Sequence, residues 1–469
     1  MGAAAQNDGG FEYDLAIVGS GGGAFAAAIA ARRRQLRVAM IERGTIGGTC
    51  VNVGCIPSKA LLAAAEARHR ARLNGFPGTS TEAGPVDFAA LIAGKREIVE
   101  GVRQDKYVDL ARDYEIELVE GDARFVDGPG LEVDGRRIEA AHYIVATGSE
   151  PHIPAIPGVR DSGYLTSTTA MELDQLPASM IVVGGGYVAM EQAQLFAHLG
   201  TTVTVLVRSQ LARREEPVIA AAIRDAFVAE GIDVVEGVDV TSVQREASHV
   251  VVKTDRGEFR ADRLLVATGR RPRTDGLVLD AAGVDLGAEG EVLVDDDMST
   301  SNSHVWAAGD VTGHPQFVYV AAKQGAIAVE NAFDRAGRRI DYAALPRITF
   351  TSPTIASAGM TEAEAQAHGI DCDGRVLDLA NVPRAIVNRN THGLAKLVAE
   401  RDSGRVLGVH LFAEGAGDAI LAAVYAIEAG RTVSDLTDGW DPYLTIGEAI
   451  HLAALAFTRD PSKLSCCAA

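Results

Sequence analysis

One glycine pattern occurs twice in this chain, and it constrains the fold more than any other feature of the sequence. The first copy is G-S-G-G-G-A at residues 19–24, and the second is G-G-G-Y-V-A at residues 184–189. A short, β-branched apolar run precedes each copy, and a helical stretch and another apolar run follow it. Strand, G-x-G-x-x-A, helix and strand is the order of a dinucleotide-binding βαβ unit. The sequence therefore predicts two nucleotide-binding units in an α/β fold.

The chemistry of such a unit depends on small residues at fixed positions. The first glycine allows the tight turn, the second lets the backbone approach a pyrophosphate, and the small third residue packs the helix on its strand. The amides at the helix N-terminus then face the anion. We therefore expect Gly19, Gly21 and Ala24 to contact one nucleotide, and Gly184 and Gly186 another. The alternative is that these are glycine-rich turns that bind no ligand. Two copies, each flanked by the expected strand, helix and strand, disfavour this alternative.

The length of 469 residues allows two or three domains. After residue 345, short strands alternate with helices and no glycine fingerprint occurs. We predict an α/β protein with two Rossmann-like nucleotide-binding domains and a C-terminal α+β domain. The second nucleotide-binding domain would be inserted in the first. The expected ranges are 1–155 and 276–345 for the first domain, 156–275 for the second and 346–469 for the C-terminal domain.

Charge and hydropathy exclude several classes of partner. The formal net charge is −19, and phosphate contacts need clustered Lys and Arg, so we expect no nucleic acid partner. No apolar run approaches the length that spans a bilayer, so we expect no membrane association. The first ten residues are small and polar and resemble no secretory signal, which favours a cytoplasmic protein.

Five cysteines are too few for a disulfide framework in a cytoplasmic protein and indicate chemistry instead. Pro57 suits the first turn of a helix, which places Cys55 at a helix N-terminus where the macrodipole stabilises a thiolate. Cys372 has no matching role and is expected to be a small hydrophobic residue or a bystander. The others are Cys50 and the adjacent pair Cys466 and Cys467 near the end of the sequence.

The segment G-G-T-C-V-N-V-G-C-I-P-S-K at residues 47–59 resembles the redox-active motif of the FAD-dependent pyridine nucleotide–disulfide oxidoreductases. The resemblance extends from about Tyr13 to Cys467. It implies that FAD occupies the first nucleotide site, that Cys55 faces the flavin, and that Cys50 is the outer, exchanging thiol. A pair of buried structural cysteines is the alternative, which so specific a motif disfavours.

The resemblance also implies other contacts. Lys59 would lie beside the flavin ring and pair with Glu191 of the second nucleotide-binding helix. Glu42 lies 23 positions after Gly19 and matches the carboxylate that binds the ribose hydroxyls of FAD. Asp310 matches the ribityl-binding aspartate of a G-D motif. The remaining FAD contacts implied are Gly44, Thr49, Ala123, Gly148 and Val318.

The second site differs from the first at one informative position. Counting 23 residues from Gly184 reaches Val207 and not an acid, and Arg208 follows it. Without a carboxylate to hold a free 2′-hydroxyl, and with Arg213 and Arg214 near, a 2′-phosphate is favoured. We therefore predict NADPH. The alternative is that the arginines only solvate a loop.

The chain departs from most disulfide reductases near its C-terminus. Those enzymes carry a His-Pro-Thr-x-x-Glu motif whose histidine and glutamate exchange protons with the thiols. Here Glu448 is retained, but Tyr443 stands at the histidine position. Tyrosine, with an ordinary pKa of about 10, is a poor proton shuttle at neutral pH. Reducing a disulfide needs that proton, whereas reducing a thiolate-bound metal ion does not.

The terminal cysteines point to a soft metal, because adjacent cysteines can close only a strained ring and suit a shared ion better. P-Y-L-T at 442–445, V-P-R-A at 382–385 and this tail together resemble the mercuric reductase branch of the family. Tyr187 matches the other tyrosine that such enzymes place near the metal. About ten residues precede the first strand, so we expect a core form without the N-terminal Cys-x-x-Cys metal-binding domain that many of these enzymes carry.

This resemblance implies NADPH-dependent, two-electron reduction of Hg(II) to Hg(0) through FAD and the pair Cys50 and Cys55, as a route of mercury detoxification. Hg(II) would arrive as thiol complexes, be captured by Cys466 and Cys467 of the partner subunit of a homodimer, and pass to the redox pair. The four cysteines are thus the candidate metal ligands. Two alternatives remain: another disulfide reductase such as lipoamide dehydrogenase, and a metal buffer with a vestigial flavin fold.

Overall fold

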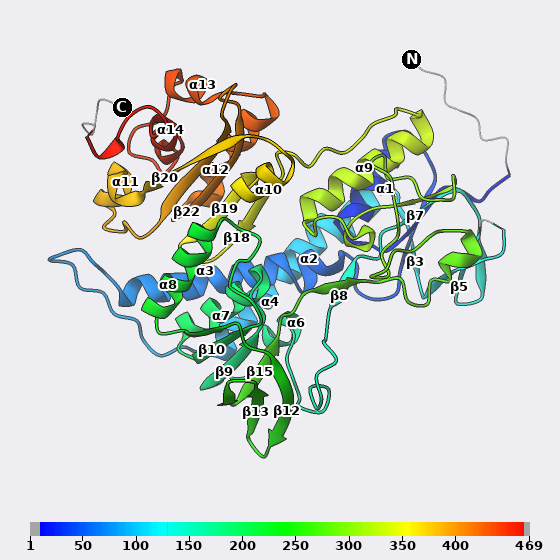
Figure 1. Cartoon of the computed structure of the whole chain (residues 1–469). Coiled ribbons are helices and arrows are strands. Elements are labelled where there is room, and N and C mark those ends of the chain that lie inside the picture. The colour runs from blue at the N-terminus through cyan, green and yellow to red at the C-terminus, as the bar shows by residue number, and fades with distance from the viewer. Residues whose placement is uncertain (1–9, 129, 464–469) are drawn as a thin grey trace. The chain divides into compact units, whose positions relative to one another are not determined.

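The computed structural model describes residues 10–128 and 130–463 (Figure 1). The chain divides into two compact units, each built from three separate segments. Helix α3 (Cys55–Arg72) begins in the first unit and ends in the second. Unit 1 comprises Met1–Ala60, Ala90–His152 and Gly269–Ile340, and unit 2 comprises Leu61–Ala89, Ile153–Thr268 and Asp341–Ala469.

Unit 1 is built on a parallel sheet of five strands in the order β17-β7-β1-β2-β3. Every residue of the central strand β1 is buried, and Asp14 alone interrupts its apolar sequence. A three-stranded antiparallel sheet and a two-stranded ribbon accompany it. The strands are β1 (Tyr13–Val18), β2 (Val38–Glu42), β3 (Glu117–Glu120), β7 (Ala140–Val145) and β17 (Val305–Ala307), then β4 (Ala123–Val126), β5 (Gly130–Val133), β6 (Arg136–Ile138), β8 (Ser149–Pro151) and β16 (Arg270–Pro272).

Helices α1 (Gly22–Arg32) and α9 (Val318–Asp334) lie side by side in unit 1 (Figure 1). A Cβ atom added to Gly325 of α9 would lie 2.1 Å from the carbonyl oxygen of Gly23 in α1, so the two backbones are nearly in contact. The other helices that begin in this unit or cross its boundary are α2 (Gly48–Asn52), α4 (Phe88–Arg103), the π-helical turn η1 (Gln104–Val108), α5 (Asp109–Asp113), and the 3₁₀ turns η2 (Leu279–Ala282) and η3 (Asp310–Thr312).

Unit 2 contains a second parallel sheet, in the order β11-β10-β9-β15, with an antiparallel sheet of β12, β13 and β14. Helix α7 (Tyr187–Leu199) follows β9 and precedes β10, which completes the second βαβ unit. The remaining elements are β9 (Ser179–Val183), β10 (Thr202–Val207), β11 (Asp233–Glu236), β12 (Val240–Glu246), β13 (His249–Thr254), β14 (Gly257–Ala261), β15 (Arg263–Val266), α6 (Ser167–Ala170) and α8 (Pro217–Ala229).

The C-terminal part of unit 2 is an antiparallel sheet in the order β18-β19-β22-β21-β20 with helices packed on it. All eight residues of the central strand β22 are buried. The elements are β18 (Pro346–Thr349), β19 (Thr354–Gly359), β20 (Cys372–Asp378), β21 (Leu394–Glu400), β22 (Val406–Ala413), α10 (Glu362–Ala367), η4 (Leu379–Asn381), α11 (Pro383–Val387), α12 (Ala416–Glu428), α13 (Val433–Asp438), α14 (Glu448–Leu455) and η5 (Pro461–Lys463).

The α/β class with two nucleotide-binding sheets and a C-terminal α+β part is confirmed. From the sequence we expect two strands that end in Ala-Thr-Gly, at residues 143–148 and 264–269, and the structure corrects both ends. Strands β7 and β15 end at Val145 and Val266, so each Ala-Thr-Gly run lies in the loop after its strand, where Gly148 and Gly269 have φ of +70° and +119°. Among the described residues no helix is both long and apolar enough to cross a bilayer. The cytoplasmic location stays a prediction.

The approach of α1 to α9 generates a stability prediction. We expect Gly325→Ala to lower the free energy of unfolding by about 1–3 kcal/mol, because the new methyl group must displace the backbone of α1. Gly94→Ala is the matched control: Gly94 lies within α4 with nothing near its Cβ position, so alanine should stabilise by about 0.5–1 kcal/mol. Urea unfolding of both variants measures this, and equal shifts in the same direction would contradict it.

Candidate active site

The first glycine-rich turn is held open at the N-terminus of α1. Gly19 has φ +107°, and a Cβ atom on it would lie 2.4 Å from the carbonyl oxygen of Ala146, so only glycine fits. Gly21 is the N-cap of α1 and nothing lies within 4 Å of its Cβ position. Ala24 is buried inside the helix. Open space therefore adjoins the N-terminus of α1, where helix amides can meet a pyrophosphate.

A carboxylate is fixed beside this turn at the end of β2. The Ser20 hydroxyl donates to Glu42 at 2.5 Å, and the backbone N–H of Gly44 donates to the other carboxylate oxygen at 2.8 Å. Ser20 in turn accepts from the backbone N–H of Gly47 at 3.0 Å. Glu42 and Gly44 are thus held beside the first glycine-rich turn, and their contact with a ribose stays a prediction. Ser20 is a positioning residue that the sequence analysis missed.

Asp310 lies at the start of η3 and belongs to a polar cluster in unit 1. The Ser149 hydroxyl donates to Asp310 at 2.6 Å. The guanidinium of Arg270 donates to both the hydroxyl and the backbone carbonyl of Ser149, at 2.7 and 2.8 Å. Sequence reasoning missed Ser149 and Arg270. Their only signal was their position next to the two Ala-Thr-Gly runs.

The other predicted flavin contacts lie at element boundaries of unit 1. Val318 begins α9 and is 39% exposed, and a Cβ atom on Gly22 of α1 would lie 2.8 Å from its Cγ2 atom. Gly148 follows β7 with open space at its Cβ position. Ala123 begins β4, on a different sheet. Val318 therefore adjoins the first glycine-rich turn, and its contact with the flavin stays a prediction.

The redox cysteines lie on two successive helical segments. Cys50 is in α2, and Cys55 is the first residue of α3, as predicted from Pro57. A Cβ atom on the intervening Gly54 would lie 2.9 Å from the carbonyl oxygen of Thr49 and 3.4 Å from the Cα atom of Cys50. A side chain at position 54 would therefore push the two cysteines apart. Both are half-buried and in the thiol form in this structure, not joined in a disulfide.

The two sulfur groups differ in their electrostatics. A side-chain hydrogen bond with Cys55 raises the pKa of Cys50 far above its ordinary value, and burial and the charge of Cys55 raise it further. The nearby ammonium group of Lys59 opposes this rise. A Cys50 thiol held protonated beside Cys55 favours Cys55 as the thiolate, in line with its position at a helix N-terminus.

Three residues that the sequence analysis missed hold this cysteine segment. The Asn52 amide donates to the carbonyl oxygens of Ile46 and Gly48, both at 2.9 Å, and Arg103 donates to the Asn52 side-chain oxygen at 3.1 Å. Tyr107 lies in η1, and its ring is 3.3 Å from the Cβ position of Gly47. Burial, followed by the charges of the two cysteines, raises the pKa of Tyr107. Asn52 lies between the two cysteines in the sequence, but no spacing relates Arg103 and Tyr107 to them.

The second glycine-rich turn, in unit 2, repeats the geometry of the first. Gly184 has φ +138°, and its Cβ position is 2.2 Å from the carbonyl oxygen of Ala267. Gly186 is the N-cap of α7, with open space at its Cβ position. Tyr187, the next residue, begins the helix and is 36% exposed. This turn also presents helix N-terminal amides to an anion.

Strand β10 ends at Val207, which is not acidic, and three arginines lie in the loop that follows it. Val207 packs against the second glycine-rich turn, and the loop after it is tied to that turn by a hydrogen bond from Ala212 N–H to the Gly185 carbonyl at 2.9 Å. Arg208, Arg213 and Arg214 are exposed, and within the described ranges none of them forms an ion pair. Their guanidinium groups can therefore meet a phosphate.

The tyrosine at the histidine position lies in the turn before α14. Tyr443 is 47% exposed, and the next residue, Leu444, has φ +59° and donates its N–H to Glu448 at 3.3 Å. Burial raises the pKa of Glu448. This geometry brings Tyr443 and Glu448 together in one turn. Cys466 and Cys467 lie outside the described residues.

The predicted pair Lys59 and Glu191 is divided between the units. Lys59 belongs to unit 1, whereas Glu191 is buried in α7 of unit 2. There its carboxylate accepts the backbone N–H of Phe350 at 3.0 Å. The pairing of Lys59 with Glu191 stays a prediction.

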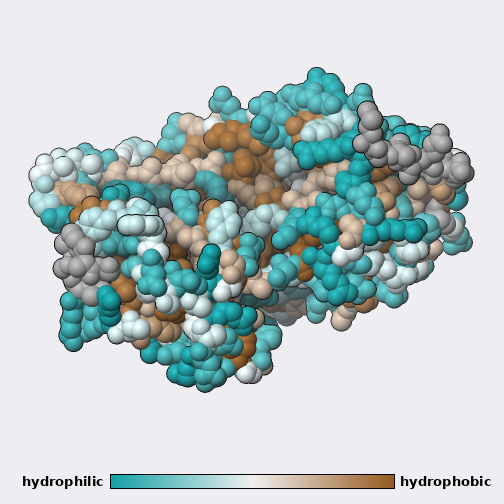
Figure 2. All heavy atoms as spheres, turned by 90° about the horizontal axis from the view of Figure 1, so that it is seen from above, coloured by the Kyte–Doolittle hydropathy of each residue, from teal (hydrophilic) through white to brown (hydrophobic). Residues whose placement is uncertain are grey.

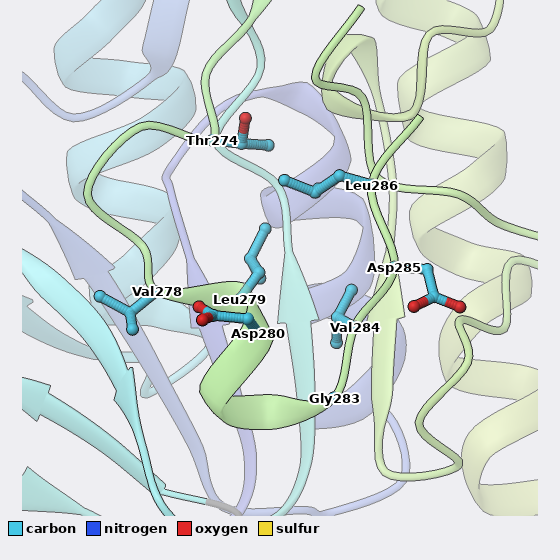
Figure 3. Close-up of a pocket in the computed structure, with 8 residues that line it drawn as sticks. All are labelled: Thr274, Val278, Leu279, Asp280, Gly283, Val284, Asp285 and Leu286. Atoms are coloured by element: carbon cyan, nitrogen blue, oxygen red, sulfur yellow. The ribbon is translucent and has the colours of Figure 1, made fainter. Parts of the chain in front are cut away.

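A pocket of about 550 Å³ lies around η2 of unit 1 (Figure 3). Leu279 extends across it toward Leu286 and Thr274. All eight lining residues come from positions 274–286, and none is a predicted nucleotide contact. This pocket is therefore separate from the site that the glycine-rich turn and the cysteines build.

Comparisons with known proteins agree with this geometry. Residues 13–325 match the model of the pyridine nucleotide-disulphide oxidoreductases, and residues 345–454 match the dimerisation domain of the same family. The chain belongs to the pyridine nucleotide–disulphide oxidoreductase family. The family predicted from residues 47–59 is thus confirmed.

Similar members of this oxidoreductase family include two mercuric reductases. That of Streptomyces lividans is 56% identical over 466 residues, which cover 97% of this chain and 98% of the relative. That of Lysinibacillus sphaericus is 47% identical, covering 97% and 84%. Among solved structures, the HOCl-induced flavoprotein disulfide reductase RclA from Escherichia coli has a TM-score of 0.86 at 29% identity, covering 94% of this chain and 99% of that chain.

The cysteine geometry predicts an asymmetric titration. In the reduced protein Cys50 should ionise above the ordinary thiol pKa of about 8.5, and Cys55→Ala should bring its pKa down toward that value, because the hydrogen bond and the charge of Cys55 are removed. The pH dependence of alkylation of each cysteine, followed by peptide mass spectrometry, measures this. Cys372→Ala should leave the Cys50 profile unchanged. The same Cys50 profile with and without Cys55 would disprove the coupling.

Proposed function

We propose that this chain is an NADPH-dependent mercury(II) reductase that reduces thiolate-bound Hg(II) to Hg(0). The observation that carries the proposal is the exposed Tyr443 in place of a histidine beside the buried Glu448, in a chain that retains both redox cysteines. The mercuric reductases at 44–56% identity over nearly the whole chain support it.

FAD and NADPH are the cofactors, and the residues present fit both. The open turn at Gly21, the fixed carboxylate of Glu42 and the cluster at Asp310 suit the pyrophosphate, ribose and ribityl groups of FAD. The turn at Gly186 and Arg208 suit the pyrophosphate and 2′-phosphate of NADPH. Bound FAD supplies the two-electron relay between the nicotinamide and the cysteine pair.

In the proposed reaction the cysteine thiolates are the metal ligands. Cys466 and Cys467 of the partner subunit capture Hg(II) from thiol complexes and hand it on by ligand exchange. Cys55, at its helix N-terminus, and then Cys50 bind the ion as thiolates, so Cys50 must lose the proton that Cys55 now stabilises on it. Two electrons reduce the ion to Hg(0), which leaves uncharged, and both thiolates are released. Tyr187 and Tyr443 would line the transfer site.

The domain division belongs to the same proposal. We assign residues 1–155 and 276–345 to the FAD-binding domain, 156–275 to the NADPH-binding domain and 346–469 to the dimerisation domain. Lys59 and Glu191 are proposed to pair beside the flavin.

The chain acts as a homodimer, in keeping with its dimerisation domain. Figure 2 shows hydrophobic areas exposed among hydrophilic ones on the face that it draws. Residues 346–469 expose several large apolar side chains that a partner subunit would cover: Ile386, Val387, Leu421, Tyr425 and Trp440.

The substrate test follows from Tyr443. The purified protein with NADPH should turn over thiol-bound Hg(II), releasing one Hg(0) per NADPH, and should reduce glutathione disulfide or lipoamide at least ~10²-fold more slowly, because a positioned proton donor contributes ~10²–10⁴-fold. Cys55→Ala should abolish Hg(II) reduction. Robust disulfide turnover, with Hg(II) acting only as an inhibitor, would falsify the proposal and leave the family assignment intact.

The cofactor test concerns Arg208. Arg208→Ala should lower kcat/KM for NADPH by roughly 10–100-fold, the value of about one charge-assisted hydrogen bond, while kcat/KM for NADH stays within about twofold. Arg224→Ala is the matched control, because Arg224 is an exposed arginine of α8 that pairs with Asp225. Steady-state kinetics measures both. A parallel loss with NADH would show that Arg208 does not read the 2′-phosphate.

A further inference from the structure

Two histidines and a glutamate meet in unit 2, outside every group that the proposed reaction uses. They are His69 near the end of α3, His198 in the last turn of α7, and Glu230 directly after α8. One ligand atom from each lies within 4.8 Å of the other two. His198 is buried, and the other two are half-buried, so a solvated ion can reach the group.

The distances among these atoms suit a tetrahedral ion. Nε2 of His198 lies 3.0 Å from one oxygen of Glu230, and Nε2 of His69 lies 3.7 Å from the other. Bonds of ~2.0–2.1 Å in tetrahedral geometry separate ligand atoms by about 3.3 Å, which falls between these two distances. A side-chain rotation of one histidine would therefore aim all three ligand atoms at one ion.

The surroundings hold the ligands in place. The Gln194 amide, one turn before His198 on α7, donates to both oxygens of Glu230 at 2.9 and 3.1 Å, and itself binds the backbone of Ser352. The guanidinium of Arg68 donates to the backbone carbonyl of His198 at 2.7 Å. Partners of this kind orient the ligands of protein metal sites.

The two imidazoles lie face to face beside the carboxylate. Their rings are stacked with centroids 3.7 Å apart and planes 12° apart, and both present a nitrogen to Glu230. Two neutral imidazoles can each donate one N–H to the carboxylate, whereas protonating both rings would stack like charges. A single divalent cation can bind both nitrogens and the carboxylate once one ring turns, because the in-plane lone pairs of two parallel rings do not meet at one point.

We propose that His69, His198 and Glu230 form a Zn(II) site that cross-links α3, α7 and the end of α8. Two imidazoles and one carboxylate are a donor set that zinc favours, and three protein ligands leave a fourth position for water. The site is independent of the redox cysteines, which prefer softer ions.

The test must exclude zinc binding by thiolates. It uses protein with Cys466→Ala and Cys467→Ala, the Cys50–Cys55 pair oxidised and metal removed by chelation. Calorimetric titration with Zn(II) should give one ion per chain at a Kd of about micromolar or below. Co(II) should give the intense visible absorption of a tetrahedral site. Stoichiometry near zero would overturn the proposal.

Matched variants assign the ligands. His69→Phe keeps the stacked ring but removes its nitrogen, and should weaken Zn(II) binding more than about 100-fold; Gln194→Ala should weaken it about 10–100-fold. His368→Phe, at an exposed histidine of unit 2, should bind like the parent. If metal-free His69→Phe melts below the parent, Glu230→Gln decides instead. Parent-like affinity in the deciding variant refutes the site.

Discussion

Both nucleotide-binding units depend on the close approach of one glycine to a backbone carbonyl oxygen in the loop that follows a neighbouring strand. Gly19 meets Ala146 in this way, and Gly184 meets Ala267. In each unit the loop after the strand that pairs with the first one, β7 beside β1 and β15 beside β9, passes directly over the glycine-rich turn. A side chain at either glycine would force that loop away, and the helix amides would no longer face the nucleotide. The two turns share this geometry although the residues between their common glycine and alanine positions differ.

Features whose causes are local could be predicted from the sequence. Strands β1 and β9 and helices α1 and α7 follow from apolar runs and glycines that are adjacent in the chain. Cys55 could be placed at a helix start because Pro57 fixes the first turn. The strand ends before Gly148 and Gly269 were misjudged, since the apolar pattern continues into residues whose backbone has already left the sheet.

Features that arise from tertiary packing could not be predicted. Asn52 and Arg103 are far apart in sequence and are joined only because α4 packs beside the cysteine segment. The cluster of His69, His198 and Glu230 draws one residue from each of three elements, and no spacing relates them. Each of these side chains, taken singly, reads as an ordinary polar residue of a helix.

The discontinuity of unit 1 has a consequence for synthesis. Strand β17 covers the edge of β7, yet the whole segment Ile153–Thr268 of unit 2 is made between them. At ~5–20 residues per second, the ribosome needs on the order of ten seconds to add that segment. During this interval the edge of β7 that will bind β17 has no partner strand, and the largely apolar residues of β7 are not yet fully covered. This edge can pair with other nascent chains. The proposed flavin site also lacks Asp310 until then, so the cofactor can complete its binding there only after that segment has been synthesised.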